Sequence, residues 1–381
     1  MKYELKQYDT PLLQFYLKRE ELGKLSYEIT WVNKEKEYLL PIGLFPQPDS
    51  LAAWLKARVI PKNREFVDRI LSRSGLAAND VIGIINICKG LSLNDSYWVV
   101  DSSFDGKFAD YNLYQNKFTT ALSLVAYTGY GSSHQIKGFT SSPEYTTNGM
   151  LRKCWRRVGG KIVLFKGGSS GFANTGNEPY SEFYAAQIAE RMGIDHVKYN
   201  LSKWKGILCS TCELFTDIDT SFVPMHRFLK EGGLEKTAEH LKTLGQDFYE
   251  AYADMLVFDA LICNTDRHSG NFGLLVDNKT NEPVRFAPLF DNGLSLFNYA
   301  MQDDIENLDV YAKTRTPANT NATYEEIFEK FATGKQKDRL RKMINFKFTR
   351  HSRYNLEKKR LVAIEDFLQR RIRKFLDTSI N

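Results

Sequence analysis

The chain has 381 residues, of which 43% are hydrophobic and 26% are charged, and its formal net charge is +6. This length and composition allow one large core or two modest ones and exclude a largely disordered protein. No apolar run reaches the length of a membrane span, and the polar N-terminus does not resemble a signal peptide. Five irregularly spaced cysteines predict reduced thiols and a cytoplasmic location.

Residues 1–135 are predicted to form a separate, mixed module without a catalytic constellation. Its expected elements are a helix over Leu12–Leu25, a hairpin of Tyr27–Trp31 and Tyr38–Pro41, an amphipathic helix over Glu65–Ser72, and a strand over Tyr97–Val100. Three arginines could form a basic face for an acidic partner or pair with Glu65 and Asp68. They are Arg58, Arg64 and Arg69.

A segment rich in glycine and serine, Gly129–Thr147, predicts a linker or exposed loop. The strands expected next, Met150–Arg156 and Lys161–Lys166, are joined by a Gly-Gly turn. A loop that covers phosphates requires such a turn, because glycine lets backbone N–H groups approach an anion. Lys166 could place its amine at the mouth of a cleft, or it could be a charged residue that closes an edge strand.

The next pattern predicts a helix over Tyr180–Met192, with Pro179 in its first turn and Gly193 as its terminator. Glu182 lies one turn into this helix, where its carboxylate could pair with a strand lysine. Glu178 is the fallback if the helix begins earlier.

Val197–Lys203 and Lys205–Phe215 predict another pair of strands, the second of which contains Cys209 and Cys212. This cysteine spacing would suit half of a zinc site or a redox pair. No second pair completes a zinc site, and a redox pair should open a helix, so we expect structural cysteines.

A long helical pattern over Glu235–Cys263, broken near Gly245, leads into a polar loop that contains Asp266 and Asn271. Two strands follow, Phe272–Val276 and Val284–Leu289, and Asp291 stands at the end of the second. Phosphoryl transfer needs such a set, since one carboxylate orients or deprotonates a hydroxyl, while an amide oxygen and a second carboxylate hold Mg²⁺. Each residue alone would suit a turn. Three in this order, between apolar strands, favour catalysis.

The sequences NTDRHSGNF at 264–272 and APLFD at 287–291 resemble the HipA-like serine/threonine kinases. These are bacterial relatives of protein kinases, known as toxins in toxin–antitoxin modules. The resemblance is specific over about residues 140–375. It implies an α+β, two-lobed, protein kinase-like fold with a mixed N-terminal extension and an all-α C-terminal lobe. The expected divisions are an accessory module (1–135), a nucleotide-binding lobe (136–218) and a helical lobe with the catalytic loop (219–381).

By this resemblance Asp266 is the catalytic base, and Asn271 and Asp291 bind metal. Lys166, positioned by Glu182, would grip the α- and β-phosphates of ATP. The other nucleotide-binding positions that the resemblance implies are Thr147, Asn148 and Gly149 in the covering loop, Glu213, Leu214 and Phe215 in the adenine linker, and His268, which is expected to pack or hydrogen-bond inside its loop. The implied cofactors are ATP and Mg²⁺.

Two features depart from the family or from ordinary protein kinases. The covering loop carries Thr146 and Thr147 where the family has an autophosphorylated serine, so self-inactivation stays open. Asn292 replaces the phenylalanine that follows the metal-binding aspartate of ordinary kinases. Residues 299–322 are polar and irregular, as an activation or substrate loop would be, and Tyr324–Thr378 predicts helices.

The leading hypothesis is an ATP- and Mg²⁺-dependent HipA-like serine/threonine protein kinase with a toxin or growth-regulating role. The alternatives are a small-molecule or lipid kinase of the same fold and a nucleotide-binding interaction protein without catalysis. The family suggests a translation component as substrate and a small DNA-binding antitoxin as partner. No membrane partner is expected. Direct nucleic-acid binding is not expected either, because the basic C-terminal stretch also has acidic and apolar residues at helical spacing. A bacterial cytoplasmic location is expected, with export as an effector left open.

Overall fold

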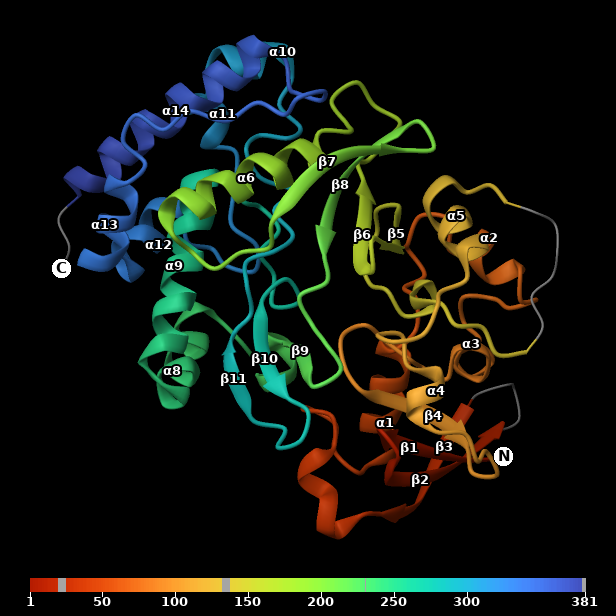
Figure 1. The fold of residues 1–381 in the computed structure, drawn as a ribbon. Coiled ribbons are helices and arrows are strands. Elements are labelled where there is room, and N and C mark those ends of the chain that lie inside the picture. Colours follow the sequence, from red (N-terminus) through yellow and green to blue (C-terminus); the bar gives the residue numbers. More distant parts are fainter. Residues whose placement is uncertain (20–24, 132–137, 230, 379–381) are drawn as a thin grey trace. The chain divides into compact units, whose positions relative to one another are not determined.

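The computed structural model describes residues 1–19, 25–131, 138–229 and 231–378 (Figure 1). The chain folds into two compact units. The first comprises residues 1–166, 214–223 and 275–284, and the second comprises residues 167–213, 224–274 and 285–381. The domain boundaries expected near residues 135 and 218 separate an accessory module and two kinase-like lobes. These boundaries stay predictions.

The N-terminal part of the first unit is built on an antiparallel sheet with the strand order β3-β2-β1-β4 (Figure 1). Its strands are β1 (Lys2–Gln7), β2 (Thr10–Arg19), β3 (Leu25–Val32) and β4 (Tyr97–Asp101). Leu5 of β1 lies opposite Leu13 of β2 and Val99 of β4. Every second residue of β1 is buried, as expected for a strand that turns one face to a core.

Short helices and an aromatic cluster complete this part of the first unit. The helices are η2 (Lys34–Leu39), α1 (Pro48–Ala57), α2 (Val67–Ser72), α3 (Val81–Cys88), α4 (Phe108–Tyr111), α5 (Thr120–Thr128) and η3 (Pro143–Tyr145). The ring of Trp98, which is fully buried, lies 5.9 Å from Phe104 and 5.7 Å from Phe108 between centroids. The predicted helix near 65–72 and the strand near 97–100 are confirmed by α2 and β4.

Two element predictions in this module are wrong. Leu12–Leu25 is not a helix, because its first part is β2, paired with β1 on one side and β3 on the other. Tyr38–Pro41 is not a strand, because η2 ends there. The side chain of Asn33 accepts a hydrogen bond from the N–H of Lys36, which begins this helical turn directly after β3.

Neither reading considered for the three arginines, a basic face or pairs with Glu65 and Asp68, holds for Arg58 and Arg64. Arg58 and Arg64 are buried, and they form ion pairs with Asp95 and Glu144, not with the acids next to Arg64 and Arg69 in the sequence. Arg69 is exposed and donates a hydrogen bond to the carbonyl of Gly129. The arginines of this region therefore mainly hold its structure together.

The predicted hairpin with a Gly-Gly turn is present as β5 (Lys153–Val158) and β6 (Lys161–Gly167). Gly159 and Gly160 have φ angles of 56° and 82°, the left-handed conformation that a two-residue hairpin turn requires. The buried Arg64–Glu144 pair anchors the hairpin, since Arg64 donates to the carbonyl of Lys153 and Glu144 accepts from the N–H of Trp155.

The expected linker at 129–147 lies partly outside the described residues, at 132–137. Its described end is not exposed, because Tyr145 and Thr146 are 0% and 5% exposed. The hydroxyl of Thr146 donates to the carbonyl of Leu91 at 2.8 Å. The exposed-loop prediction is therefore wrong for this part of the segment.

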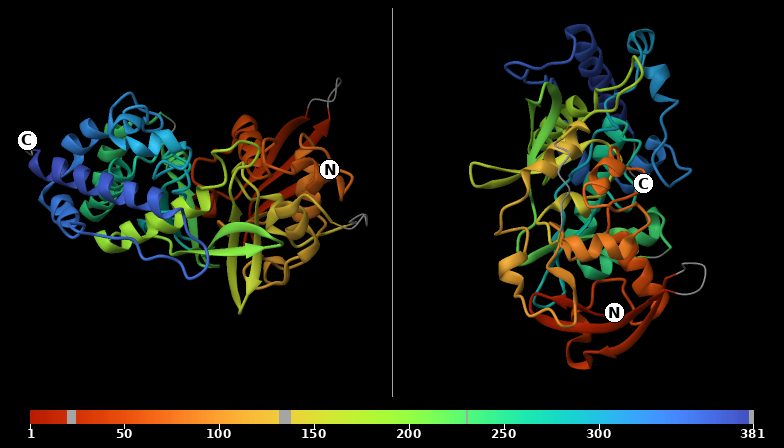
Figure 2. Two further views of the ribbon diagram at one scale, coloured as in Figure 1. Left: turned by 90° about the horizontal axis from the view of Figure 1, so that it is seen from above. Right: turned by 90° about the vertical axis from the view of Figure 1, so that its right-hand side faces the viewer.

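The second unit is mainly helical (Figure 2). Its elements are α6 (Glu178–Met192), β7 (Tyr199–Trp204), β8 (Ile207–Glu213), α7 (Met225–Phe228), α8 (Leu234–Leu244), α9 (Gln246–Ile262), α10 (Gln302–Glu306), α11 (Leu308–Ala312), α12 (Tyr324–Phe331), α13 (Gly334–Arg341) and α14 (Lys358–Asp377). The predicted helix end at Gly193 is confirmed, since this residue has a φ of 70° and its N–H donates to the carbonyl of Ala189.

The core of the second unit surrounds α9, which is buried almost throughout its C-terminal half. The break predicted near Gly245 is confirmed, because α8 ends at Leu244 and α9 begins at Gln246. The rings of Phe328 on α12 and Phe375 on α14 stack with their centroids 4.1 Å apart. Both rings belong to the same core cluster as Leu261 and Ile262 at the end of α9, from which the polar loop departs.

The hairpin that follows this loop is made by β10 (Gly273–Asp277) and β11 (Pro283–Phe286). With β9 (Thr220–Pro224) it forms a sheet of the order β11-β10-β9. The two predicted strands are thus confirmed, although the second ends at Phe286 and not at Leu289. Short strands therefore accompany the helices of residues 219–381.

Many basic residues near the C-terminus form ion pairs across helices. Arg370 pairs with Asp309, and Lys374 and Arg371 both pair with Glu325. These pairs agree with the expected solvated helical face. No helix among the described residues is both long enough and apolar enough to cross a bilayer. All five cysteines are buried, as structural thiols would be.

Candidate functional site

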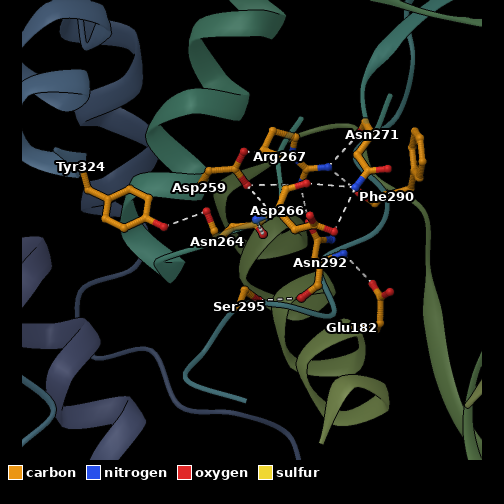
Figure 3. Close-up of polar contacts among 10 residues, drawn as sticks. All are labelled: Glu182, Asp259, Asn264, Asp266, Arg267, Asn271, Phe290, Asn292, Ser295 and Tyr324. Carbon is orange, nitrogen blue, oxygen red and sulfur yellow. Dashed lines mark hydrogen bonds and ion pairs between the residues drawn. The ribbon is translucent and has the colours of Figure 1, made fainter. Parts of the chain in front are cut away.

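The polar loop after α9 is held in place by side chains at its base (Figure 3). Cys263 ends the helix with a φ of 53°, which turns the chain out of the helical path. Asn264 is 1% exposed, and its amide nitrogen donates to Asp259 Oδ1 at 2.9 Å while its Oδ1 accepts the N–H of Asp266 at 3.1 Å. The hydroxyl of Tyr324 donates to the carbonyl of Asn264 at 2.7 Å. These bonds fix the start of the loop.

The structure brings Asp266 and Asn271 into direct contact. Nδ2 of Asn271 donates to the carbonyl of Asp266 at 2.9 Å and lies 3.4 Å from its Oδ2. Two tight turns make this possible, since His268 N–H donates to Asp266 O and Asn271 N–H donates to His268 O, each at 2.8 Å. Because Nδ2 is used in this way, Oδ1 of Asn271 points away from Asp266 (Figure 3).

His268 forms a hydrogen bond inside the loop, as expected. Its Nδ1 accepts the N–H of Gly270 at 3.0 Å, which requires the tautomer with its proton on Nε2. A Cβ at Gly270 would lie 2.8 Å from Cε1 of His268. The glycine is therefore needed because the imidazole approaches its backbone closely.

Arg267 joins the loop to the segment that carries Asp291. It is 8% exposed, and its guanidinium forms a two-pronged ion pair with Asp259, with Nε 2.9 Å from Oδ2 and Nη2 3.1 Å from Oδ1. Nη1 donates to the carbonyls of Asn271 at 2.9 Å and Phe290 at 2.5 Å, and Nη2 donates to Asn292 Oδ1 at 2.5 Å. All five N–H groups of this side chain are thus used.

The segment before Asp291 is fixed by backbone bonds to the chain that follows α6. Leu289 N–H donates to the carbonyl of Asp195, and Val197 N–H donates to the carbonyl of Leu289, both at 2.9 Å. Asp291 itself has a φ of 56°, and its N–H donates to the hydroxyl of Tyr199 at 3.2 Å. The left-handed conformation is uncommon for aspartate and marks a sharp change of direction at this residue.

Burial raises the pKa of Tyr199 well above its ordinary value of 10, and the negative charges of Glu182 and Asp291 raise it further. Its hydroxyl therefore stays protonated at neutral pH.

Glu182 and Glu178, the two candidates on α6, have different partners. Oε2 of Glu182, which is 0% exposed, accepts the N–H of Asn292 at 2.8 Å (Figure 3). Glu178 accepts from the N–H and hydroxyl of Ser169 and from the hydroxyl of Tyr299. Glu182 is thus the one beside the Asp291 segment. Lys166 is the next-to-last residue of β6 in the first unit, and its predicted pair with Glu182 stays a prediction.

The predicted covering loop at Thr147, Asn148 and Gly149 is a turn in the first unit that surrounds the Lys153 side chain. Lys153 Nζ donates to the carbonyl of Asn148 at 2.9 Å, and a Cβ at Gly149 would lie 2.1 Å from that nitrogen. The φ of Gly149 is 93°. Thr147 donates through its hydroxyl to the carbonyl of Pro143. The turn is therefore held by the side chains of Thr147, Lys153 and Arg64, the last of which donates to the carbonyl of Thr147 at 2.9 Å.

The predicted adenine linker begins at the end of β8. Glu213 is the last residue of this strand and is exposed. The N–H of Leu214 donates to the carbonyl of Ile162 at 2.9 Å, and the ring of Phe215 packs edge-on against Phe222 at 5.6 Å between centroids. The nucleotide-binding roles of these residues stay predictions.

Several residues of this network were not found from the sequence. Asp259, Asn264, Arg267 and Asn292 contribute buried polar groups, and Tyr199 contributes the acceptor for Asp291. Asp259 carried a signal, since it is a charged residue inside the apolar helical run LVFDALI. Arg267 stands inside the recognised motif, but only the structure shows what it binds.

The donor set of this region fits Mg²⁺ bound together with a phosphate ligand. Asn271 Oδ1 and the Asp291 carboxylate are hard oxygen ligands, and Mg²⁺ is commonly held by one or two carboxylates plus phosphates. Among the described residues no group of three or more His, Cys, Asp or Glu could hold a metal. A cation at this place would therefore need phosphate or water oxygens to complete its coordination.

Comparisons with known proteins bear on the family and the fold of the chain. A family profile described as the HipA-like C-terminal domain matches residues 114–352. The serine/threonine-protein kinase CtkA of Helicobacter pylori (strain J99 / ATCC 700824) is 27% identical over 145 residues, which is 34% of this chain and 43% of that protein. The chain therefore matches less than half the length of this relative.

Two solved structures are similar in fold. The Helicobacter pylori proinflammatory kinase CtkA has a TM-score of 0.46 at 18% identity, covering 62% of this chain and 92% of that one. HipA of Shewanella oneidensis MR-1, from a complex with HipB and its operator DNA, has a TM-score of 0.51 at 11% identity, covering 99% and 100%. The expected α+β, HipA-like fold is confirmed, and the match over 114–352 shows that the chain belongs to the family of HipA-like C-terminal domains.

Proposed function

We propose that this protein is an ATP- and Mg²⁺-dependent serine/threonine protein kinase. The observation that carries the proposal is the contact between Asp266 and Asn271, together with the link from Arg267 to the segment of Asp291. A kinase needs a hydroxyl-orienting carboxylate next to metal-binding oxygens, and this loop supplies that combination. The relative CtkA is a serine/threonine-protein kinase by name, which supports the choice of acceptor.

In the proposed reaction Asp266 accepts the proton of the acceptor hydroxyl as the oxygen–phosphorus bond forms. The bond between the γ-phosphorus and the β–γ bridging oxygen breaks, and ADP leaves. Mg²⁺, when bound by Asn271 and Asp291, would neutralise phosphate charge. Lys166, paired with Glu182, would hold the α- and β-phosphates. Most of the rate enhancement would come from positioning and charge stabilisation.

The remaining residues would form the nucleotide site around this centre. The turn at Thr147–Gly149 would cover the phosphates, and the main chain at Glu213–Phe215 would contact adenine. His268 would shape the loop through its bond to Gly270. Thr146 is a poor autophosphorylation site in this conformation, because its buried hydroxyl is hydrogen-bonded to Leu91.

The wider role that we propose follows the family and its relatives. HipA of Shewanella oneidensis is found in a complex with HipB and operator DNA as a toxin–antitoxin system. By analogy, a small DNA-binding antitoxin is the proposed partner, and a protein of the translation apparatus in a bacterial cytoplasm is the proposed substrate. Co-expression with the product of a neighbouring small gene, followed by size-exclusion chromatography, would test the partner.

Transfer of labelled γ-phosphate to a generic basic protein, with purified full-length chain and Mg²⁺, tests the proposed activity. We expect label on serine or threonine, and Asp266→Asn should lower the rate by about 10²–10⁴-fold, the usual contribution of a general base. ATP affinity should be unchanged. Asp303→Asn, which alters an exposed aspartate on α10, is the matched control and should retain full activity.

The alternatives make different predictions in the same assay. Nucleotide binding without transfer to protein, but with ATP consumption on adding a small-molecule acceptor, would replace the protein kinase by a small-molecule or lipid kinase. Nucleotide binding without any consumption would indicate an interaction protein. An Asp266→Asn variant as active as wild type would contradict the assigned base.

A further inference from the structure

The two proposed metal ligands lie on different segments, and one guanidinium nitrogen connects the backbones of those segments. Nη1 of Arg267 holds the carbonyl of Asn271 at 2.9 Å and the carbonyl of Phe290, the residue before Asp291, at 2.5 Å. Movement of either segment would break one of these bonds. The position of Asn271 relative to the Asp291 segment is therefore coupled to one side chain.

The guanidinium is itself fixed on its other side. Asp259 binds Nε and Nη2 from α9, and both residues are almost fully buried. A guanidinium is planar and rigid, so two bonds to one carboxylate set the direction of the remaining N–H groups. Because Asp259 belongs to the buried core helix, this direction is determined by the scaffold of the second unit.

Asn292, the residue after Asp291, links the Asp291 segment to the Arg267 guanidinium. Its Oδ1 accepts from Arg267 Nη2 at 2.5 Å, its N–H donates to Glu182 at 2.8 Å, and its carbonyl accepts from the hydroxyl of Ser295 at 2.7 Å. Asn292 is 1% exposed, so the three bonds are shielded from water. The residue after Asp291 is thus held by polar bonds from three directions.

We propose that Arg267 is a positioning residue that, held by Asp259 and Asn292, sets the spacing of Asn271 and Asp291 and so tunes the affinity for Mg²⁺ bound with a nucleotide. This inference rests on the proposed function. Mg²⁺ demands near-ideal octahedral geometry with short bonds, so a small error in ligand spacing weakens its binding. Residues that orient metal ligands typically change metal affinity by about 10–100-fold when substituted.

The test is the affinity for a non-hydrolysable ATP analogue, measured by calorimetry with Mg²⁺ and with EDTA, for full-length wild type and variants. In wild type, the analogue should bind more tightly with Mg²⁺ than with EDTA. The ratio of these two affinities is the metal-dependent gain. In Arg267→Lys, which cannot bridge the two carbonyls and Asp259 in the same way, this metal-dependent gain should fall by about 10–100-fold while the affinity in EDTA stays unchanged. Loss of affinity in EDTA as well would show general disruption and contradict a positioning role.

Two variants at Asn292 test the same inference if Arg267→Lys does not fold well. Asn292→Ala removes only the side-chain acceptor, and it should lower the metal-dependent gain by a smaller factor. Asn292→Asp keeps an oxygen at the same place and should restore most of that gain. Thermal unfolding of each variant confirms that the comparison is between folded proteins.

Arg371→Lys is the matched control. Arg371 is 7% exposed in the same unit and binds the carbonyl of Ala260 and the carboxylate of Glu325, neither of which is a proposed metal ligand or a partner of Arg267. Its replacement should lower thermal stability without altering the metal-dependent gain. An equal loss in Arg371→Lys would show that any buried arginine has this effect and would overturn the inference.

The outcomes separate this inference from the proposed function. A wild type that transfers phosphate, with variants that show an unchanged metal-dependent gain, overturns the positioning role alone. A wild type that binds the analogue equally with and without Mg²⁺ also overturns it. A wild type that neither binds nucleotide nor transfers phosphate contradicts both.

Discussion

At the scale of single residues, hydrogen bonds surround the residue after Asp291. In the proposed matching of Asp291 with the metal-binding aspartate of ordinary protein kinases, Asn292 replaces the phenylalanine that follows it, and it is buried with bonds to Arg267, Glu182 and Ser295. An aromatic side chain at that position can move between pockets with little directional preference. Hydrogen bonds to three different elements define one geometry, so we expect this segment to be less mobile.

The hydroxyl of Tyr199 is the hydrogen-bond acceptor for the backbone of Asp291. Tyr199→Phe removes this acceptor from the N–H of a residue in a left-handed conformation. We expect a loss of about 1 kcal/mol in the free energy of unfolding and a several-fold fall in kcat, because one hydrogen bond is lost and it helps to fix the position of the Asp291 carboxylate. Urea denaturation and phosphate transfer measure the two effects.

Tyr180→Phe is the matched control for this prediction. Tyr180 lies half-buried on α6 in the same unit, and Tyr180→Phe should leave kcat unchanged. Equal kcat values for Tyr199→Phe and wild type would show that the bond to Asp291 does not matter for catalysis.

At the scale of elements, the helical unit was predicted better than the N-terminal module. The patterns for α6, α8, α9 and the final helices are local, since helical periodicity, a terminal glycine and a first-turn proline lie within the segment itself. β2 could not be identified in this way. Its sequence LLQFYL places apolar residues at spacings that suit a helix as well as a strand, and pairing with β1 and β3 decides the outcome.

Gly245 separates the two helices that lead to the polar loop of Asp266 and Asn271. Its φ of 146° and ψ of 160° lie in a region that is essentially reserved for glycine. Gly245→Ala should therefore lower the free energy of unfolding by about 1–3 kcal/mol through backbone strain, since an added Cβ would meet only Phe248 at an ordinary 3.7 Å. Urea denaturation measures this change.

Gly232→Ala offers the comparison for that substitution. Gly232 has no positive φ, and nothing lies within 4 Å of an added Cβ. The variant should be as stable as wild type. A Gly245→Ala protein that is equally stable would mean that the junction between α8 and α9 adapts without strain.

At the scale of the whole molecule, the sequence suggested candidate site residues but not the connections between them. Asp266, Asn271 and Asp291 were proposed from their types and spacing, and the structure brings Asp266 and Asn271 into contact. The buried bonds of Arg267 to Asp259, Phe290 and Asn292 could not, because they join positions up to 25 residues apart through side-chain directions that no spacing encodes.

The same distinction explains the misassigned arginines of the N-terminal module. Arg58 and Arg64 were compared with acids close in the sequence, but their partners Asp95 and Glu144 lie 37 and 80 residues away. A sequence gives only the separation of two residues along the chain, so acids close to each arginine were considered as partners. In a folded chain a buried arginine needs a buried carboxylate, wherever the chain supplies one.

The central claim is that Asn271 and Asp291 hold Mg²⁺ for a nucleotide whose acceptor is oriented by Asp266. A crystal structure of the full chain with Mg²⁺ and a non-hydrolysable ATP analogue tests it most directly. We predict a metal ion about 2.1 Å from Asn271 Oδ1 and from an Asp291 carboxylate oxygen, with phosphate oxygens completing its coordination and Asp266 facing the γ-phosphate. A nucleotide bound elsewhere, or a metal on other residues, would contradict the account.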